Sequence, residues 1–398
     1  MPSTCSGSRR FTGTSGEPRR RRPISAPADT RGSGLGAALE RLLPAFAVAV
    51  FVLATAATLA VAGNSLGYDF LAYHNAASRL LAGQPPYDMS YVIAGQFGLF
   101  FYPPTFLLLT IPFGLLPAAP ATLLWIEMLL VAFGVGVAVM PVAVRTRWLI
   151  VLLAGLSWPF LYDVKLGQVG TLLFLLFAVG WRNLDRPAIL GLTGAIGAAI
   201  KIQPGLVLAW ALLTRRWLAV VAGAVVLVLL AVAATLLAGP QAWADFLTIL
   251  ARVADPITTP HNCTLGAVAY QLGVPRDVAA MIQWAGSGLV VLAVVFAALR
   301  RSAAPSYLVV VVATQMLSPI LWDHYAMLLL LPVAWLVDRG RTWAVLIPLA
   351  SCVVLVEVIP PVVYPVVFWI TLVALLVEPV TKGDAPARPS REALPSAP

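Results

Sequence analysis

Long apolar runs recur along almost the whole chain and limit what it can fold into. A helix of about 20 apolar residues spans the hydrocarbon core of a bilayer, and shorter or broken spans are tolerated where they line a polar cavity. We predict spans over 44–63, 121–143, 148–162, 168–181, 187–200, 204–214, 217–238, 284–299, 305–321, 325–338, 342–358 and 361–379. The chain is therefore predicted to be an all-α integral membrane protein with about twelve transmembrane helices.

Composition supports one membrane domain without a separate soluble domain. Of the 398 residues, 60% are hydrophobic and only 11% are charged, whereas a soluble domain carries about 25% charged residues. We expect the membrane domain to cover 44–380. Residues 1–43 are rich in Arg, Ser, Pro and Gly, so we expect a disordered, basic, cytoplasmic N-terminus, and a disordered polar tail over 381–398.

The net charge of +9 does not indicate a nucleic-acid-binding protein, because the arginines lie almost entirely at the ends of the apolar runs. That placement is typical of membrane topology. Cys5, Cys263 and Cys352 lie far apart and form no metal-binding spacing. We predict neither a metal nor a cofactor.

The run 99–117 is ambiguous because its prolines at 103, 104, 112 and 117 interrupt a helix. If it stays on the outer side, all but five of the 26 Lys and Arg residues lie inside. If it crosses and 187–214 becomes a single span, eight lie outside and Lys201 is left in the middle of the membrane. The positive-inside rule favours the first arrangement. Both termini are then cytoplasmic, and 64–120, 163–167, 201–203 and 239–283 face outward.

Five cations are left on the outer side. Lys165 and Lys201 lie at the mouths of short spans, where cations could bind a lipid-linked phosphate. The alternative is that each side chain merely extends to the lipid headgroups. Gln168 follows Lys165 in a Gly167-Gln168-Val169-Gly170 turn, and its glycines are also ordinary helix terminators. The remaining outer cations are Arg79, Arg252 and Arg276.

Asp69 opens a polar segment that follows the first span. It precedes a predicted helix over 70–82, which Gly83 ends. One interpretation is that Asp69 is the N-cap of that helix. The other is that it is a functional carboxylate, since Tyr68 and Tyr73 flank it on the outer membrane face.

His324 lies between two predicted spans, directly after Trp322 and Asp323. A lone histidine in a membrane protein can be a packed polar residue with a backbone partner. Because ionisable groups are costly in a membrane, the adjacent Asp323 favours a functional cluster. Asn262-Cys263-Thr264 matches the N-x-T glycosylation pattern, which is frequent by chance.

Several segments resemble, in order, glycosyltransferase family 87. They are GYDFLAYHNAASRLLAGQPPY, FYPPTFLLLTIPFGLLP, KLGQVGTLLFLL, KIQPGLVLAWALLTRRW and SPILWDHY. The combination of Asp69, Tyr73 and the Tyr102-Pro103-Pro104 sequence is fairly specific to this family, whose members belong to the GT-C superfamily. The resemblance covers about 44–338.

The resemblance implies a GT-C fold whose first outer loop carries a catalytic Asp and interfacial helices. Asp69 matches that position, and His324 resembles the histidine near the active site. Lys165 and Lys201 fall in lysine-containing blocks of the family. The first loop has no Asp-x-Asp pair, since Phe70 and Leu71 follow Asp69, which also argues against a metal.

The resemblance also implies a polyprenyl-phosphate sugar donor, with mannose the first candidate, and a lipid or glycan acceptor at the membrane. We expect Asp69 to act as general base, His324 to orient donor or acceptor, and Lys165, Lys201 and Arg79 to bind phosphate. Substrate contacts are also expected from Tyr73, Tyr102, Gln168 and Asp323. A transporter or flippase of a lipid-linked sugar is the alternative.

Overall fold

The structure is a computed structural model that describes residues 34–89, 99–252 and 255–379. The chain divides between Arg41 and Leu42 into two compact units. The described part of the first unit is the start of helix α1 (Gly34–Ala60), and all other elements belong to the second unit. The predictions for 1–33 and for the tail 381–398 lie outside the described residues.

The described residues of the second unit are helical and form no β-strand. After α1 the α-helices are α2 (Tyr68–Leu81), α3 (Leu107–Gly114), α4 (Ala118–Val139), α5 (Val144–Leu156), α6 (Trp158–Leu166), α7 (Gly170–Arg182), α8 (Pro187–Ile200), α9 (Leu206–Leu213), α10 (Trp217–Ala238), α11 (Gln241–Arg252), α12 (Leu265–Gln271), α13 (Arg276–Arg300), α14 (Ala303–Met316), α15 (Leu330–Asp338), α16 (Leu346–Leu349) and α17 (Val363–Val377). Short 3-10 helices are η1 (Gly63–Ser65), η2 (Pro104–Phe106), η3 (Gln203–Gly205), η4 (Asp323–Leu329), η5 (Thr342–Val345) and η6 (Val353–Val358). The all-α prediction is confirmed.

Among the described residues, four helices are long and apolar enough to cross a membrane: Arg41–Ala60 of α1, α4, α10 and α13. A fifth span results if α6 and α7, which meet at 116°, are taken as one broken span. Large apolar side chains on the outside of these helices face away from the protein, such as Leu53, Leu229 and Leu292. The structure thus supports a membrane protein, whereas the number of twelve spans stays a prediction.

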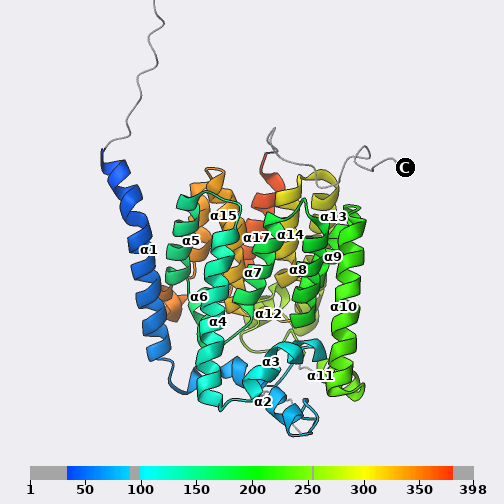
Figure 1. The fold of residues 1–398 in the computed structure, drawn as a ribbon. Helices are drawn as coiled ribbons and strands as arrows, with labels where there is room; N and C mark the ends of the chain where they lie inside the picture. The colour runs from blue at the N-terminus through cyan, green and yellow to red at the C-terminus, as the bar shows by residue number, and fades with distance from the viewer. Residues whose placement is uncertain (1–33, 90–98, 253–254, 380–398) are drawn as a thin grey trace, which may run out of the picture. The chain divides into compact units, whose positions relative to one another are not determined.

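Helix α14 lies at the centre of the bundle. Every residue from Pro305 to Met316 is buried, and α14 packs against α7, α9, α13, α15 and α17. A helix that is surrounded by other helices on all sides has no polar face exposed to solvent. The other long helices, including α4, α8 and α10, run side by side around it (Figure 1).

Two predicted spans are wrong as single helices, and they fail at the same contact. The run 148–162 breaks between α5 and α6, and the run 342–358 breaks into η5, α16 and η6. Trp158 N–H donates to Ser351 O at 2.9 Å, and Ser157 pairs with Cys352. Backbone groups that hydrogen-bond to each other across the core are not available for the hydrogen bonds within their own helices, so both helices end there.

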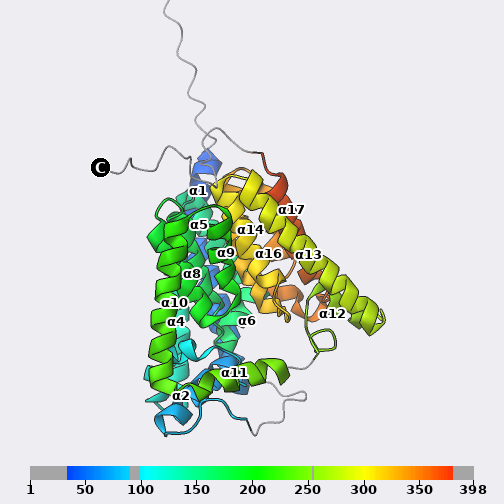
Figure 2. The ribbon, with the colours of Figure 1, turned by 90° about the vertical axis from the view of Figure 1, so that its right-hand side faces the viewer.

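The run 99–117 does not cross the bundle. It forms η2 and α3, and at 1.5 Å per residue these eleven residues, Pro104–Gly114, reach only about half of a bilayer core. Ser78 Oγ on α2 donates to Gly114 O at 3.4 Å, and His74 Nε2 contacts Leu116 O at 2.9 Å. Helices α2 and α3 therefore pack together at one end of the bundle, next to α11 (Figures 1 and 2).

The bundle has two chemically different ends. We call the first the arginine end: there α4 meets α5, α7 meets α8, α9 meets α10, α13 meets α14, and α15 meets η5. The opposite end, which we call the Asp69 end, holds α2, α3, α11 and the turns that join α6 to α7 and α8 to α9 (Figure 1). The predicted site residues on α2 and in the turns that join α6 to α7 and α8 to α9 therefore lie at the Asp69 end.

Candidate active site

Asp69 lies in the first turn of α2, and the start of this helix is fixed by Gly67. Gly67 has φ +67°, which favours glycine, and its N–H donates to Lys165 O at 2.8 Å. Because Gly67 is the N-cap residue and no side chain caps the helix, the N-cap interpretation of Asp69 is wrong. The bond to Lys165 instead brings Asp69 to the end of α6.

One oxygen of Asp69 is held by an amide. Gln168 Nε2 donates to Asp69 Oδ2 at 2.7 Å. Gln168 lies in the turn between α6 and α7, which follows Gly167. Gly167 has φ +69° and ends α6, and a Cβ there would lie 2.7 Å from Phe70 Cβ. The turn thus needs glycine at 167 to bring Gln168 against α2.

Two tyrosines fix the other end of the Gln168 amide. Tyr102 OH donates to Gln168 Oε1 at 2.9 Å, Tyr73 OH donates to it at 3.2 Å, and the two hydroxyls lie 2.7 Å apart. The Val169 backbone N–H, which can only donate, also bonds Oε1 at 3.3 Å, so the amide N–H points at Asp69. The predicted residues Asp69, Tyr73, Tyr102 and Gln168 therefore form one hydrogen-bonded group, which we call the Asp69 cluster.

Aromatic packing holds the Asp69 cluster in place. Phe70 stacks on Trp125 of α4 with ring centroids 5.1 Å apart, and Trp125 Nε1 donates to Gly167 O at 2.8 Å. Tyr73 packs edge-on against Tyr102 at 4.8 Å and against Phe106 at 5.0 Å. The site is thereby built on α2, α4 and the α6–α7 turn together.

Lys201 lies beside this cluster. It follows α8 directly, in an extended conformation before η3. Its Nζ donates to Tyr325 OH at 2.7 Å and lies 4.0 Å from the centre of the Tyr325 ring and 5.7 Å from that of Tyr102. These distances are typical of cation–π contacts. Among the described side chains, Lys201 has no carboxylate partner within ion-pair distance.

His324 and Asp323 form a second group at the start of η4. Asp323 Oδ1 accepts the His324 backbone N–H at 2.8 Å and lies 3.5 Å from His324 Nδ1, while Trp158 Nε1 donates to Asp323 Oδ2 at 3.1 Å. Burial alone would raise the pKa of Asp323, but the imidazole of His324 beside it and the hydrogen bonds from the His324 backbone N–H and the Trp158 indole lower it below its ordinary value. Asp323 is therefore held as a carboxylate.

Tyr325 joins the two groups, and the sequence analysis missed it. Its hydroxyl accepts from Lys201, and its ring packs edge-on against His324 with centroids 4.9 Å apart. His324 is buried, and neither ring nitrogen has a hydrogen-bond partner among the described residues. An imidazole in this state can still donate or accept a hydrogen bond from a bound molecule.

The charges at this end act on Asp69 in opposite directions. Burial raises the pKa of Asp69, and the charge of His324, the Gln168 hydrogen bond and the charge of Lys201 oppose that rise without cancelling it. The residue remains partly exposed. A partly exposed carboxylate with a raised pKa is suited to accept a proton near neutral pH.

Two predicted cations are placed differently. Lys165 lies on α6, with Nζ 5.5 Å from the centre of the Tyr162 ring, and Tyr162 in turn contacts His324. Arg79 is not brought to the Asp69 cluster: its Nη1 forms an ion pair with Asp88 Oδ2 at 3.1 Å, and its Nε donates to Pro85 O. The structure thus puts Lys165 beside the His324 group and Arg79 in separate surroundings.

A buried carboxylate on α6 was also missed. Asp163 is 1% exposed and its Oδ2 has no partner among the described residues. A Cβ at Gly170 would lie 2.3 Å from Asp163 Oδ1, so glycine at 170 makes room for this side chain. An acidic residue at the end of an apolar run is an available sequence signal for a functional residue.

Asn262 does not look like a glycosylation site. It is fully buried, and its Nδ2 donates to Pro256 O at 2.7 Å and to Pro319 O at 3.1 Å. Its Oδ1 accepts from Leu321 N–H at 2.9 Å. Asn262 therefore fixes the loop that leads into Asp323 and His324.

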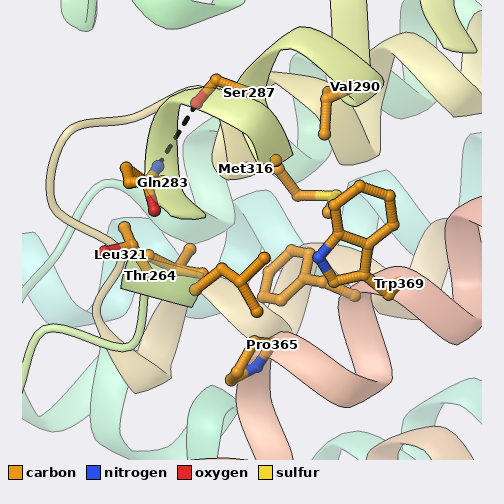
Figure 3. A pocket seen from close by; sticks show the side chains of 11 residues that line it. Thr264, Gln283, Ser287, Val290, Met316, Leu321, Pro365 and Trp369 are labelled. Carbon is orange, nitrogen blue, oxygen red and sulfur yellow. Dashed lines mark hydrogen bonds between the residues drawn. The ribbon is translucent and has the colours of Figure 1, made fainter. Parts of the chain in front are cut away.

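A small crevice lies between α12, α13 and α17 (Figure 3). It has a volume of about 20 Å³ and is mostly apolar, with Gln283 Nε2 donating to Ser287 Oγ at 3.3 Å on its wall. Its lining contains no ionisable side chain. The crevice is too small for a sugar, so it is not the candidate active site.

Comparison with known proteins identifies the family. Residues 100–332 match the family model described as glycosyltransferase family 87, which is more than half of the 398 residues. The chain belongs to glycosyltransferase family 87. No curated protein and no solved structure matches it.

Membership of family 87 confirms the predicted resemblance and shows that the protein is a glycosyltransferase. The matched range includes Tyr102, Lys165, Gln168, Lys201 and His324, whereas Asp69 and Tyr73 precede it. The roles of the individual residues stay predictions. Among the described residues, no group of three or more His, Cys, Asp and Glu side chains could hold a metal ion, and the expectation that none is needed also stays a prediction.

Proposed function

We propose that this family 87 glycosyltransferase transfers a sugar, with mannose the first candidate, from a polyprenyl-phosphate donor to a lipid or glycan acceptor. The observation that carries the proposal is the pairing of an orientated carboxylate with a nearby cation. Gln168 holds one oxygen of Asp69, and Lys201 lies beside the same cluster without a carboxylate partner among the described residues. Base and phosphate ligand are then side by side.

The chemistry is a single displacement. The acceptor hydroxyl gives its proton to the Asp69 carboxylate while its oxygen attacks the anomeric carbon of the donor. The bond between that carbon and the phosphate oxygen breaks, and polyprenyl phosphate leaves with the electron pair. One displacement inverts the configuration at the anomeric carbon.

The leaving phosphate gains negative charge as the bond breaks. Lys201 and Lys165 are the candidate groups to stabilise this phosphate. The Lys201 ammonium is positioned by its hydrogen bond to Tyr325 and by the Tyr102 ring. His324, whose buried ring nitrogens have no hydrogen-bond partner among the described residues and which lies beside Asp323, is the candidate to orient the donor or the acceptor. Arg79 is left out of this group because Asp88 already pairs with it.

The proposed membrane arrangement follows the charges. The arginine end would lie in the cytoplasm with both termini, and the Asp69 end would face the outer, periplasmic side of the cytoplasmic membrane. Helices α2, α3 and α11 would be the interfacial helices of a GT-C-type bundle of about twelve spans. Membership of a transferase family disfavours the alternative of a transporter or flippase.

The test uses membranes from cells that express the protein and from cells that lack it. Both are incubated with labelled polyprenyl-phosphate mannose and, in parallel, with other polyprenyl-phosphate sugars. We expect a new labelled lipid or glycan only where the protein is present, with the anomeric configuration inverted relative to the donor. Absence of a product with every donor, or a product of retained configuration, would contradict the proposal.

A further inference from the structure

A cavity of about 380 Å³ opens along α2, between that helix, residues 86–88 and 99–100, and Ile249 of α11. Small ligands commonly bind in cavities of about 300–1,000 Å³. Its α2 wall includes Ala72, Asn75, Ala76, Ser78 and Arg79. The cavity is thus large enough for a sugar ring.

Two parts of the cavity wall adjoin the Asp69 cluster. On α2, Ala72 and Ala76 stand three and seven positions after Asp69, which puts them on the same face of the helix. On the opposite wall, Tyr87 OH donates to Tyr102 O at 2.7 Å, and Tyr102 belongs to the Asp69 cluster. The cavity and the Asp69 cluster therefore adjoin each other through α2 and through the contact of Tyr87 with Tyr102.

The charge of the cavity is balanced within its own wall. Arg79 Nη1 lies 3.1 Å from Asp88 Oδ2, and Arg79 Nε donates to Pro85 O at 2.9 Å. A guanidinium that is already paired and fixed attracts an anion much less than a free one. This cation therefore suits a neutral ligand better than a phosphate.

The lining has the mixture of groups that hydroxyl-rich molecules bind. Asn75, Ser78, Arg79 and Asp88 together offer both donors and acceptors. Tyr87 and Phe100 add an apolar part of the wall, where the two buried rings pack against each other with centroids 5.4 Å apart. A ring with several hydroxyls would satisfy both kinds of surface.

We propose that this cavity binds the acceptor through a neutral, hydroxyl-rich head group such as a sugar or cyclitol ring. The assignment rests on the proposed function, because it supplies the acceptor hydroxyl to Asp69. The assignment gives each substrate its own binding site. The anionic donor lies at Lys201 and Lys165, and the neutral acceptor head group lies along α2.

Binding is measured on the Asp69→Asn protein in phosphatidylcholine nanodiscs, which excludes sugar detergents. Saturation-transfer NMR follows methyl α-mannopyranoside, with inorganic phosphate as competitor. Asn75→Leu changes an exposed residue of the cavity wall, and Asn64→Leu makes the same change at an exposed residue of η1 outside that wall. We expect a signal in the parent that falls at least five-fold in Asn75→Leu, stays in Asn64→Leu and is not displaced by phosphate.

No mannoside signal in the parent, an equal signal in Asn75→Leu, or displacement by phosphate would overturn the assignment. Asp88→Asn tests the charge argument, because it leaves Arg79 without this carboxylate and should allow phosphate to compete. Phosphate that still fails to compete in this variant would contradict that argument.

A transfer assay on the chain with Asp69 intact separates the two proposals. Asn75→Leu is expected to raise KM for the acceptor at least five-fold and to leave KM for the donor unchanged. If mannoside binds as expected but no sugar is transferred, the cavity stands and the proposed function fails. If transfer proceeds with an unchanged acceptor KM in Asn75→Leu, the function stands and the cavity assignment fails.

Discussion

The arginine end and the Asp69 end both carry cations, but their partners differ. At the arginine end, Arg341 pairs with Glu378 at 2.9 Å, Arg301 donates to Glu378 O and Arg216 donates to Leu184 O. At the Asp69 end, the Lys201 ammonium contacts only tyrosine hydroxyl and ring atoms among the described residues. Cations of the first kind are already satisfied, whereas Lys201 remains able to bind an added anion.

The carboxylates differ in the same way. Asp338 at the arginine end accepts from Ala143 N–H at 2.8 Å and from Thr146 Oγ1 at 3.0 Å, so it ties α15 to the start of α5. Asp69 has one oxygen held by Gln168, and the structure records no bond to Oδ1 from the described residues. The comparison teaches that pairing, more than charge itself, separates groups that hold the fold from groups available to substrates.

Lys201→Ala should have the largest effect among substitutions that leave Asp69 in place. Removing a cation that stabilises the leaving phosphate is expected to lower kcat by about 10²–10³-fold and to weaken use of the donor. Tyr325→Phe removes the hydrogen bond and keeps the charge, so its loss should be clearly smaller. Steady-state kinetics at varied donor concentration measure both; equal losses would show that the Lys201 charge is not what matters.

Gln168→Glu should move the pH dependence. Because the pKa of Asp69 is raised, activity of the unmodified protein should fall as the pH drops through a value above that of an ordinary carboxylate. A second carboxylate beside Asp69 makes the pair of acids hold a proton to higher pH. The acid limb of the pH–activity profile should therefore move to higher pH by about one pH unit or more.

The control for this shift is Gln241→Glu on α11. Gln241 Nε2 donates to Asp245 Oδ1 at 2.9 Å, so the change creates the same pair of acids outside the Asp69 cluster. We expect the pH profile of this variant to match the unmodified protein. A profile that moves equally in both variants would remove Asp69 as the titrating base.

Arg341→Gln should have the smallest effect. The side chain is 44% exposed, and exposed ion pairs contribute little to stability. We expect a small decrease in melting temperature, followed by thermal unfolding in nanodiscs, and a transfer rate within about two-fold of the unmodified protein. A loss of transfer comparable to that of Lys201→Ala would break the contrast between the two ends.

Much of the helix arrangement could be predicted because apolar length and helix breakers are visible in the sequence. The predicted spans 187–200 and 217–238 coincide with α8 and α10. The charge distribution also kept 99–117 at the same end as Asp69, where η2 and α3 lie. These features depend on local sequence and on the cost of burying charge.

The break at Ser157 has a local signal, because Pro159 disfavours a helix that continues through the residues before it. The contact that joins Ser157 and Ser351 could not be predicted, because it depends on one backbone bonding another far along the chain. Trp158 N–H and Ser351 O meet only in the folded protein. Neither segment contains a signal for this contact on its own.

The candidate site was predicted in part. Asp69, Tyr73, Tyr102 and Gln168 were each predicted as site residues, and the structure brings them together in one hydrogen-bonded group. Arg79 could not be separated from the other outer cations, since its partner Asp88 depends on how the chain turns after α2. Asp163 was overlooked because the segment 163–167 was predicted as an outward-facing turn, in which a carboxylate is ordinary, whereas Asp163 is buried and a glycine at 170 makes room for it.

The most direct test is sugar transfer by Asp69→Asn, with Asp338→Asn as the matched change at the arginine end. Both proteins are placed in nanodiscs with labelled polyprenyl-phosphate mannose and a membrane lipid extract. Burial raises the pKa of Asp69. The protonated Asp69 side chain therefore favours the folded protein, and this contribution to folding stability is lost as the pH rises through that pKa. Asp69→Asn should therefore melt no lower than the unmodified protein at neutral pH.

Transfer by Asp69→Asn is expected to fall by about 10²–10⁴-fold, the usual contribution of a general base, while Asp338→Asn keeps its rate. Full transfer by a correctly folded Asp69→Asn protein would contradict the assignment of Asp69 as the catalytic base.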